Sequence, residues 1–138
     1  MPDYNSKENF LKISEINTKI QESIASKLGN SKFWIQAEIA GFKVTKGHCY
    51  LTLIEKQLNT TNPIASIKGM IWSNNFMILN RKFKSVAGLE LKDNIKILFL
   101  ATVNYNLLYG LNLTIEDIEP GYTLGTMLQE RDSIVKRL

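Results

Sequence analysis

Aliphatic residues near the start of the chain recur every three or four positions. This spacing places them on one side of an α-helix, because an α-helix turns once every 3.6 residues. Gly29 and Asn30 then interrupt the pattern, and both residue types are common just after a helix. We therefore predict an N-terminal helical segment at residues 1–30. Its apolar stripe consists of Ile13, Ile16, Ile20, Ile24 and Leu28.

From residue 33 onward, apolar and polar residues alternate at every second position, which is typical of β-strands with one buried side. Turn residues such as Lys46-Gly47 and Asn62-Pro63 separate the alternating stretches. Helical spacing returns after Ser73 and again after Thr126. The predicted strands cover residues 33–42, 48–55, 64–72, 94–105 and 111–118, and the two later helices cover residues 73–83 and 126–138.

Five short strands with a helix between the third and the fourth follow the order of an OB-fold, which is a five-stranded Greek-key barrel. We therefore predict a mainly β chain, with an N-terminal helix, a helix between strands three and four, and a C-terminal helix. The barrel domain is expected at residues 31–122. Residues 123–138 are expected to begin a helix that leads away from it.

Composition places the chain among ordinary globular domains. It has 138 residues, of which 44% are hydrophobic and 22% are charged. No apolar stretch approaches the roughly 20 residues that span a bilayer, and the first residues lack the pattern of a signal peptide. The single cysteine, Cys49, excludes an internal disulfide. We expect a soluble, cytoplasmic protein with no membrane contact.

Positive charge is concentrated in the middle of the chain. The formal net charge is +4, but residues 41–100 contain nine lysines and arginines against three acidic residues. A basic region of this kind indicates a polyanionic partner such as a nucleic acid. A solvated surface would have the same composition, so charge alone leaves both interpretations open.

The outward side of strands two and three in an OB-fold binds oligonucleotides, together with the loops that join strands one to two and four to five. Alternation assigns aromatic and basic side chains to that surface. Lysines neutralise phosphates and flat rings stack on unpaired bases, so this pattern favours single-stranded nucleic acid. Trp72 could instead pack on the following helix, and His48 could be an ordinary hydrogen-bonded strand residue. The predicted binding residues are Lys43 and Lys46 in the first loop, His48, Tyr50 and Thr52 on strand two, Lys68 and Trp72 on strand three, and Tyr105 and Tyr109 beside the second loop.

Sequence signals for catalysis are absent. No histidine accompanies a nucleophile motif, no glycine-rich phosphate loop occurs, and no ligand spacing fits a metal. Glu116, Asp117 and Glu119 are close in sequence, but we interpret them as a solvated strand end. We therefore expect no catalytic residue, no metal and no cofactor within these residues.

Several short motifs occur along the chain in a characteristic order. They are Ile13-Ser14-Glu15-Ile16-Asn17, Trp34-Ile35-Gln36-Ala37-Glu38-Ile39, Phe42-Lys43, Gly47-His48-Cys49-Tyr50-Leu51-Thr52-Leu53, Gly69-Met70-Ile71-Trp72 and Glu116-Asp117-Ile118-Glu119-Pro120-Gly121. Together they resemble the N-terminal OB-fold domain of exodeoxyribonuclease VII large subunits. The resemblance runs from about Ile13 to the last residue.

The resemblance implies an enzyme that degrades single-stranded DNA from either end to 5′-phosphorylated oligonucleotides without requiring a divalent metal. It also implies a cytoplasmic complex with several copies of a small subunit. In this family the nuclease domain and the helical region that binds the small subunit both lie after the OB domain. In two places the sequence departs from the family. The loop at residues 56–63 is longer, and the tip at residues 106–110 lacks the usual basic residue.

We expect the chain to be the single-stranded DNA-binding module of such an enzyme, inactive by itself. Two other functions are compatible with the same residues. The barrel could be a protein-interaction module that docks on the nuclease domain or on neighbouring subunits, since Met70, Trp72 and an amphipathic first helix would suit that role. It could also bind RNA, because the fold and the charge are shared with RNA-binding OB domains.

Overall fold

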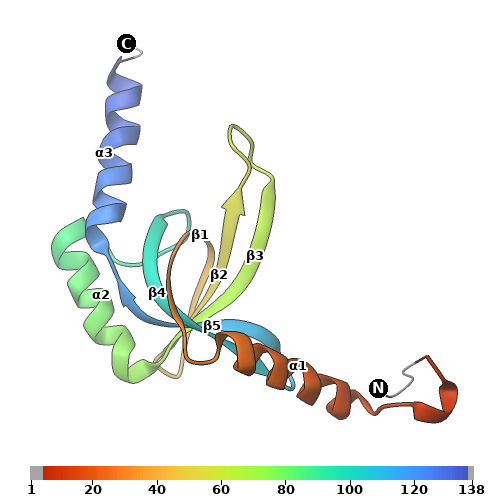
Figure 1. Ribbon diagram of the computed structural model, residues 1–138. Coiled ribbons are helices and arrows are strands. Elements are labelled where there is room, and N and C mark those ends of the chain that lie inside the picture. Colours follow the sequence, from red (N-terminus) through yellow and green to blue (C-terminus); the bar gives the residue numbers. More distant parts are fainter. Residues whose placement is uncertain (1–4, 137–138) are drawn as a thin grey trace.

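Within residues 5–136, the part of the chain that the computed structural model describes, three α-helices and a 3-10 turn accompany five strands (Figure 1). For residues 132–136 only the backbone is described. Residues 1–4 and 137–138, the outer ends of the two predicted terminal segments, lie outside the described residues. The elements are η1 (Lys7–Asn9), α1 (Ile13–Leu28), β1 (Lys32–Thr45), β2 (His48–Lys56), β3 (Pro63–Ile71), α2 (Ser73–Ala87), β4 (Lys96–Asn106), β5 (Gly110–Ile118) and α3 (Pro120–Lys136).

The five strands close into a barrel in the order β1-β2-β3-β5-β4. β3 and β5 run parallel, and all other neighbouring strands run antiparallel. Helices precede the first strand, separate the third from the fourth and follow the fifth. This topology confirms the predicted OB-fold barrel and the predicted positions of its three helices.

A bulge in β1 decides which side chains face outward at its second half. Ile39 pairs with Leu53, but Gly41 pairs with Thr52, so one extra residue, Ala40, lies between the two pairs. An extra residue reverses the sides of the strand beyond it. Lys43 therefore lies on the same side as Gly41, away from the core.

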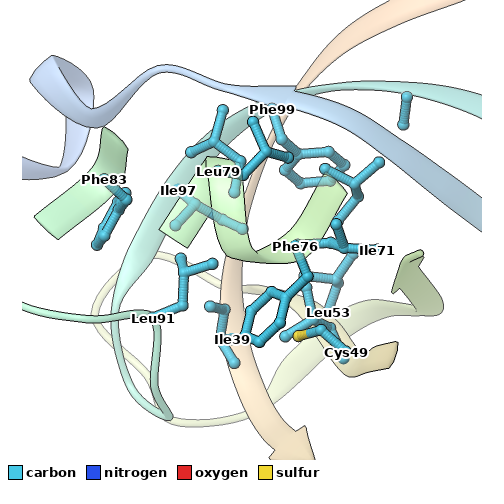
Figure 2. Packing of buried hydrophobic residues seen from close by; sticks show 14 of the residues in the cluster. Ile39, Cys49, Leu53, Ile71, Phe76, Leu79, Phe83, Leu91, Ile97 and Phe99 are labelled. Atoms are coloured by element: carbon cyan, nitrogen blue, oxygen red, sulfur yellow. The ribbon is translucent and has the colours of Figure 1, made fainter. Parts of the chain in front are cut away.

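The core fills the barrel and continues under α2. Figure 2 shows Leu79 of α2 close to Ile97 of β4, and Phe76 of α2 close to Ile39 and Cys49; with Phe83 and Phe99 they belong to one cluster. These side chains are buried, and Phe83 and Phe99 are among the largest that are fully buried. Burial of an aromatic side chain contributes roughly 1.5–3 kcal/mol, so α2 closes one end of the barrel as part of the same core.

The first helix is attached to the barrel mainly by polar contacts. Asn17 and Gln21 donate side-chain hydrogen bonds to the backbone carbonyls of Leu107 and Tyr105, at 2.9 and 3.0 Å. No residue of α1 is fully buried, and Ile13 is exposed over 79% of its surface. The helix therefore extends from the β4–β5 end of the barrel (Figure 1). Much of its apolar stripe is uncovered.

The last helix begins at Pro120 rather than near residue 126, and this part of the sequence prediction was wrong. Proline fits the first position of a helix, since its φ is already helical and its missing N–H needs no partner there. The Glu119 carboxylate accepts a hydrogen bond from the Gly121 N–H at 3.0 Å. The Thr123 hydroxyl, fully buried, donates to the Lys96 carbonyl at 2.6 Å. Pro120-Gly121 therefore starts a helix that is anchored to β4.

Candidate nucleic-acid interface

The outward side chains of β2 and β3 form rows that continue onto β1. Tyr50 lies opposite Lys43 of β1 on one side and opposite Met70 of β3 on the other. In the next row, Thr52 lies opposite Lys68. We call this surface the β2–β3 face; it consists of Lys43, His48, Tyr50, Thr52, Lys68, Met70 and Trp72.

The alternation predicted from sequence is confirmed on both central strands. Cys49 and Leu51 of β2 are buried, whereas Tyr50 between them is exposed over 42% of its surface. On β3, Ile71 is buried and Lys68 is exposed. One wall of the barrel therefore presents its apolar side to the core and its aromatic and basic side to solvent.

Lys43 and Lys46 occupy different positions from those expected. Lys43 was expected in the loop after the first strand, but it lies within β1, where the bulge turns it toward the outside. The connection to β2 is only two residues long, Lys46 and Gly47, and both have positive φ, at 54° and 83°. This geometry is typical of a type I′ hairpin turn. Lys46 therefore lies at one end of the β2–β3 face.

Lys68 is held by a neighbour on the face. Its ammonium group donates a hydrogen bond to the Thr52 hydroxyl at 2.9 Å. The residue of β3 that pairs with Tyr50 is Met70 and not Lys68. Lys68 is instead a diagonal neighbour of Tyr50, at the distance of about 7–8 Å that separates such positions.

His48 and Trp72 make direct contact where β2 begins and β3 ends. Their ring centroids are 5.2 Å apart and the planes are perpendicular, which is an edge-to-face arrangement. The Nδ1 atom of His48 accepts a hydrogen bond from the Ser73 N–H at 3.0 Å. Trp72 remains exposed over 50% of its surface. His48 is thus a hydrogen-bonded strand residue, as one of the two interpretations expected, and Trp72 precedes α2 with half of its surface exposed.

The lysines of this surface have no acidic partner. Among the described residues, no carboxylate forms an ion pair with Lys43, Lys46 or Lys68. Lysines elsewhere on the barrel do form them: the ion pairs are Lys32–Glu116, Lys56–Glu38, Lys82–Asp117, Lys84–Glu90 and Lys96–Glu130. Ammonium groups without a carboxylate neighbour are the ones available to a phosphate.

The structure does not bring Tyr105 to the β2–β3 face. Its hydroxyl donates a hydrogen bond to the Asn17 side chain of α1 at 3.2 Å, so the residue anchors that helix. Tyr109 is exposed over 85% of its surface in the turn at residues 107–109. Asn112, three residues later in the chain, pairs with Lys68 of the face. Three strand residues span about 10 Å. Tyr109 therefore lies at the margin of the face.

Two polar residues of β5 adjoin the face and were missed by sequence reasoning. Asn112 lies opposite Lys68, and Thr114 lies opposite Met70, in the parallel pairing of β3 with β5. The Thr114 hydroxyl accepts a hydrogen bond from the Asn104 amide at 2.6 Å. Their position follows from the strand order of the OB-fold, which places β5 beside β3. That order was the signal that could have identified them.

Neither a metal cluster nor an activated thiol was found among the described residues. Within residues 5–136, no group of three or more His, Cys, Asp or Glu side chains could hold a metal ion. Burial raises the pKa of the Cys49 thiol to about 12, so this thiol stays neutral. Among the same residues, no helix is both long enough and apolar enough to cross a bilayer.

Several known proteins are similar to this chain. The exodeoxyribonuclease 7 large subunit of Deinococcus radiodurans is 29% identical over 122 residues, which cover 86% of this chain. The chain spans 29% of the length of that relative. Crystal structures of the mitochondrial single-stranded DNA binding protein Rim1 from S. cerevisiae and of a small single-stranded DNA binding protein from Mycoplasma pneumoniae match 64% of this chain. The matched parts amount to 91% of the Rim1 chain and 90% of the Mycoplasma pneumoniae chain. The sequence identities are 13% and 10%, and the TM-scores are 0.43 and 0.45.

The similarity to an exodeoxyribonuclease 7 large subunit over most of the chain confirms the resemblance inferred from the ordered motifs. A family model described as an OB-fold nucleic acid binding domain matches residues 11–119. That range includes all five strands and α2. The chain therefore belongs to the family of OB-fold nucleic acid binding domains.

Proposed function

We propose that this chain binds single-stranded DNA through the β2–β3 face, with little preference for sequence. One observation supports this most strongly. The strand register places Tyr50 and Trp72 on the same surface as Lys43 and Lys68, and neither lysine has an acidic partner there. Rings and free ammonium groups are the two components that single-strand binding requires.

The physical basis is different for the two kinds of side chain. Each base stacked on an aromatic ring contributes about 1–3 kcal/mol, whichever base it is, because every base has a flat π surface. Each phosphate neutralised by a lysine releases counterions, so that part of the affinity falls with salt. A duplex keeps its bases stacked on one another, so the rings of Tyr50 and Trp72 favour a single strand.

We propose further that the chain is the substrate-binding module of an exodeoxyribonuclease VII large subunit. Sequence similarity to such a subunit supports this, as do the ordered motifs. The complete enzyme would degrade single-stranded DNA to 5′-phosphorylated oligonucleotides in the cytoplasm. It would assemble with a small subunit through a region that follows the OB domain. The nuclease residues would also lie in that region, so we expect the 138-residue chain alone to be inactive.

A titration with fluorescein-labelled oligo-dT tests the DNA-binding function. We expect binding at low salt, and a logarithmic slope of affinity against salt of about −0.7 for each neutralised phosphate. The matched duplex should bind more weakly, because its bases are not available to the rings. Absence of binding at low salt would contradict the proposal, and tighter binding of the matched oligo-rU would favour the RNA-binding alternative.

A second candidate function is docking on another protein. The observation that favours it is the exposed apolar stripe of α1, where Ile13, Ile16 and Ile20 are exposed over 79%, 43% and 37% of their surfaces. Exposed apolar patches often mark interaction surfaces. Replacing Ile13 and Ile16 by serine should change the oligomeric state or subunit assembly and leave DNA affinity intact. The reverse result would assign the stripe to DNA binding.

A further inference from the structure

His48 connects three parts of the molecule at one end of the β2–β3 face. Its imidazole touches the Trp72 ring, and its Nδ1 atom accepts the Ser73 N–H. Ser73 is the first residue of α2, where backbone N–H groups have no partner within the helix. The β1–β2 turn also approaches this point, since a Cβ added at Gly47 would lie 3.2 Å from the Ser73 Cβ. His48 is therefore fixed by the backbone around it.

The hydrogen bond determines how the imidazole is presented. Because Nδ1 accepts a hydrogen bond, the proton of the neutral ring lies on Nε2. The ring cannot rotate about its χ angles without losing the Ser73 N–H, and it meets the indole of Trp72 at 90°. Trp72 itself precedes α2 in an extended conformation, with half of its surface exposed. The contact with His48 is the one ring contact of Trp72 within the described residues.

We propose, on the basis of the DNA-binding function proposed above, that His48 is a positioning residue for Trp72. It restricts the indole to one orientation, in which the exposed surface of the ring is available to a base. Without this contact, Trp72 would sample several rotamers and would lose that freedom on stacking, which weakens binding. His48 thus acts on DNA through Trp72, and Tyr50 and Lys68 are not involved.

A double-mutant cycle on the full chain tests this, with oligo-dT affinity measured at low salt. Trp72→Ala is expected to weaken binding by about 5- to 150-fold, the loss that corresponds to one stacked base. His48→Ala is expected to weaken binding by about 2- to 12-fold, the range of an aromatic pair contact. In the Trp72→Ala background, however, His48→Ala should have almost no further effect. Equal losses in both backgrounds would show that His48 contacts DNA independently and would overturn the proposal.

Two further variants separate positioning from the capping of α2. His48→Asn retains an acceptor atom at the place of Nδ1 but has no ring, so it should preserve the melting temperature and still bind as weakly as His48→Ala. His48→Phe retains a ring without the acceptor and should recover part of the affinity. If His48→Asn binds DNA like the wild type, the ring contact is irrelevant and the proposal is wrong.

A spectroscopic readout reports on Trp72 directly. In a Trp34→Phe background, Trp72 is the only indole of the chain. His48→Ala should lower its fluorescence anisotropy in the absence of DNA, since the ring gains rotameric freedom. An unchanged anisotropy would contradict the positioning role. If Trp72→Ala binds oligo-dT like the wild type, the face itself is misassigned, and that outcome is distinct from failure of the cycle.

Discussion

Two walls of the same barrel carry an exposed tryptophan and several lysines, yet they differ in what their lysines contact. On the β2–β3 face, Trp72 is accompanied by Lys43 and Lys68, which have no acidic partner among the described residues. On another part of the sheet, which we call the β1–β4 face, Trp34 is accompanied by Lys32 and Lys96; this face consists of Lys32, Trp34, Gln36, Lys96, Leu98 and Leu100.

The lysines of the β1–β4 face are engaged within the protein. Lys32 pairs with Glu116 at 2.9 Å and Lys96 with Glu130 at 3.0 Å. The hydrogen bond that the Lys96 ammonium donates to the Glu130 carboxylate raises the pKa of Lys96. A phosphate would have to compete with these carboxylates and would also be repelled by them. An exposed ring beside a lysine is therefore insufficient as a nucleic-acid signal, and the pairing state of the lysine distinguishes the two faces.

The largest expected effect is on the reaction rate of the thiol in the barrel wall beneath the β2–β3 face. Cys49 lies on its inner side, and burial raises the pKa of the thiol to about 12. In the folded chain the thiol should react with a disulfide reagent at least about 1,000-fold more slowly than in the unfolded chain, because reaction requires opening of a stable core. Rapid labelling at neutral pH would show that this wall is open and that the two faces do not belong to one closed barrel.

The same shift predicts how stability depends on pH. The unfolded thiol ionises near its ordinary pKa of 9.0, whereas the folded thiol stays protonated up to about 12. The unfolded state therefore loses a proton first, and this contribution to the free energy of unfolding falls as the pH rises from 9 towards 12. Cys49→Ala should reduce this fall between pH 9 and 10.5, measured by denaturant titration with the wild type as control.

The two tryptophans provide the next test. Trp72 and Trp34 are exposed over 50% and 53% of their surfaces, so replacing either with alanine removes a similarly exposed ring. Trp72→Ala is expected to weaken oligo-dT binding by about 1–3 kcal/mol, and Trp34→Ala should leave it within experimental error. Equal losses in a fluorescence-anisotropy titration would abolish the distinction between the faces.

A smaller effect is expected for the lysines. Lys43→Ala and Lys68→Ala should each reduce the salt slope of binding by about 0.7, because each removes one phosphate contact. Lys27→Ala and Lys92→Ala remove the same charge from α1 and from the segment before β4, away from the face. These controls should keep the wild-type slope. If all four variants change the slope alike, binding depends on net charge and the β2–β3 face has no special role.

The smallest effect is expected from releasing a paired lysine. Glu130→Gln leaves Lys96 without its carboxylate, and the free energy of unfolding should fall by less than about 1 kcal/mol, as for other exposed ion pairs. Affinity for oligo-dT should stay within about twofold of the wild type, since Glu38 still lies opposite Lys96 and would repel a phosphate there. A marked gain in affinity would mean that ion pairing alone keeps the β1–β4 face from binding DNA.

Periodicity in the sequence was sufficient for the elements and the topology but not for every position on them. Alternation identified the outward side of β2 and β3, because the two strands keep a period of two from Cys49↔Ile71 to Glu55↔Ala65. It could not show the bulge at Ala40, since one extra residue leaves no mark in a short apolar pattern. Lys43 was consequently placed in a loop. The last helix was predicted to begin near residue 126, because the hydrogen bond that caps its start at Pro120 comes from the side chain of Glu119.

Features that depend on tertiary packing could not be predicted from the sequence. Tyr105 was predicted to bind nucleic acid beside the loop between strands four and five. Its hydroxyl is instead hydrogen-bonded to the side chain of Asn17, 88 residues earlier in the chain. The carboxylates that form ion pairs with Lys32 and Lys96 come from β5 and α3. These ion pairs distinguish the two faces, and they could not be recognised without the tertiary structure. The contact of His48 with Trp72 likewise arises from the register of β2 with β3.

The most direct measurement is a ¹H–¹⁵N NMR titration of the chain with unlabelled oligo-dT, in which the indole N–H resonances of Trp72 and Trp34 are followed together. We expect the Trp72 resonance, with the backbone amides of Tyr50 and Lys68, to shift progressively, and the Trp34 resonance to stay in place. Movement of Trp34 with Trp72 unchanged, or equal movement of both, would contradict the assignment of DNA binding to the β2–β3 face.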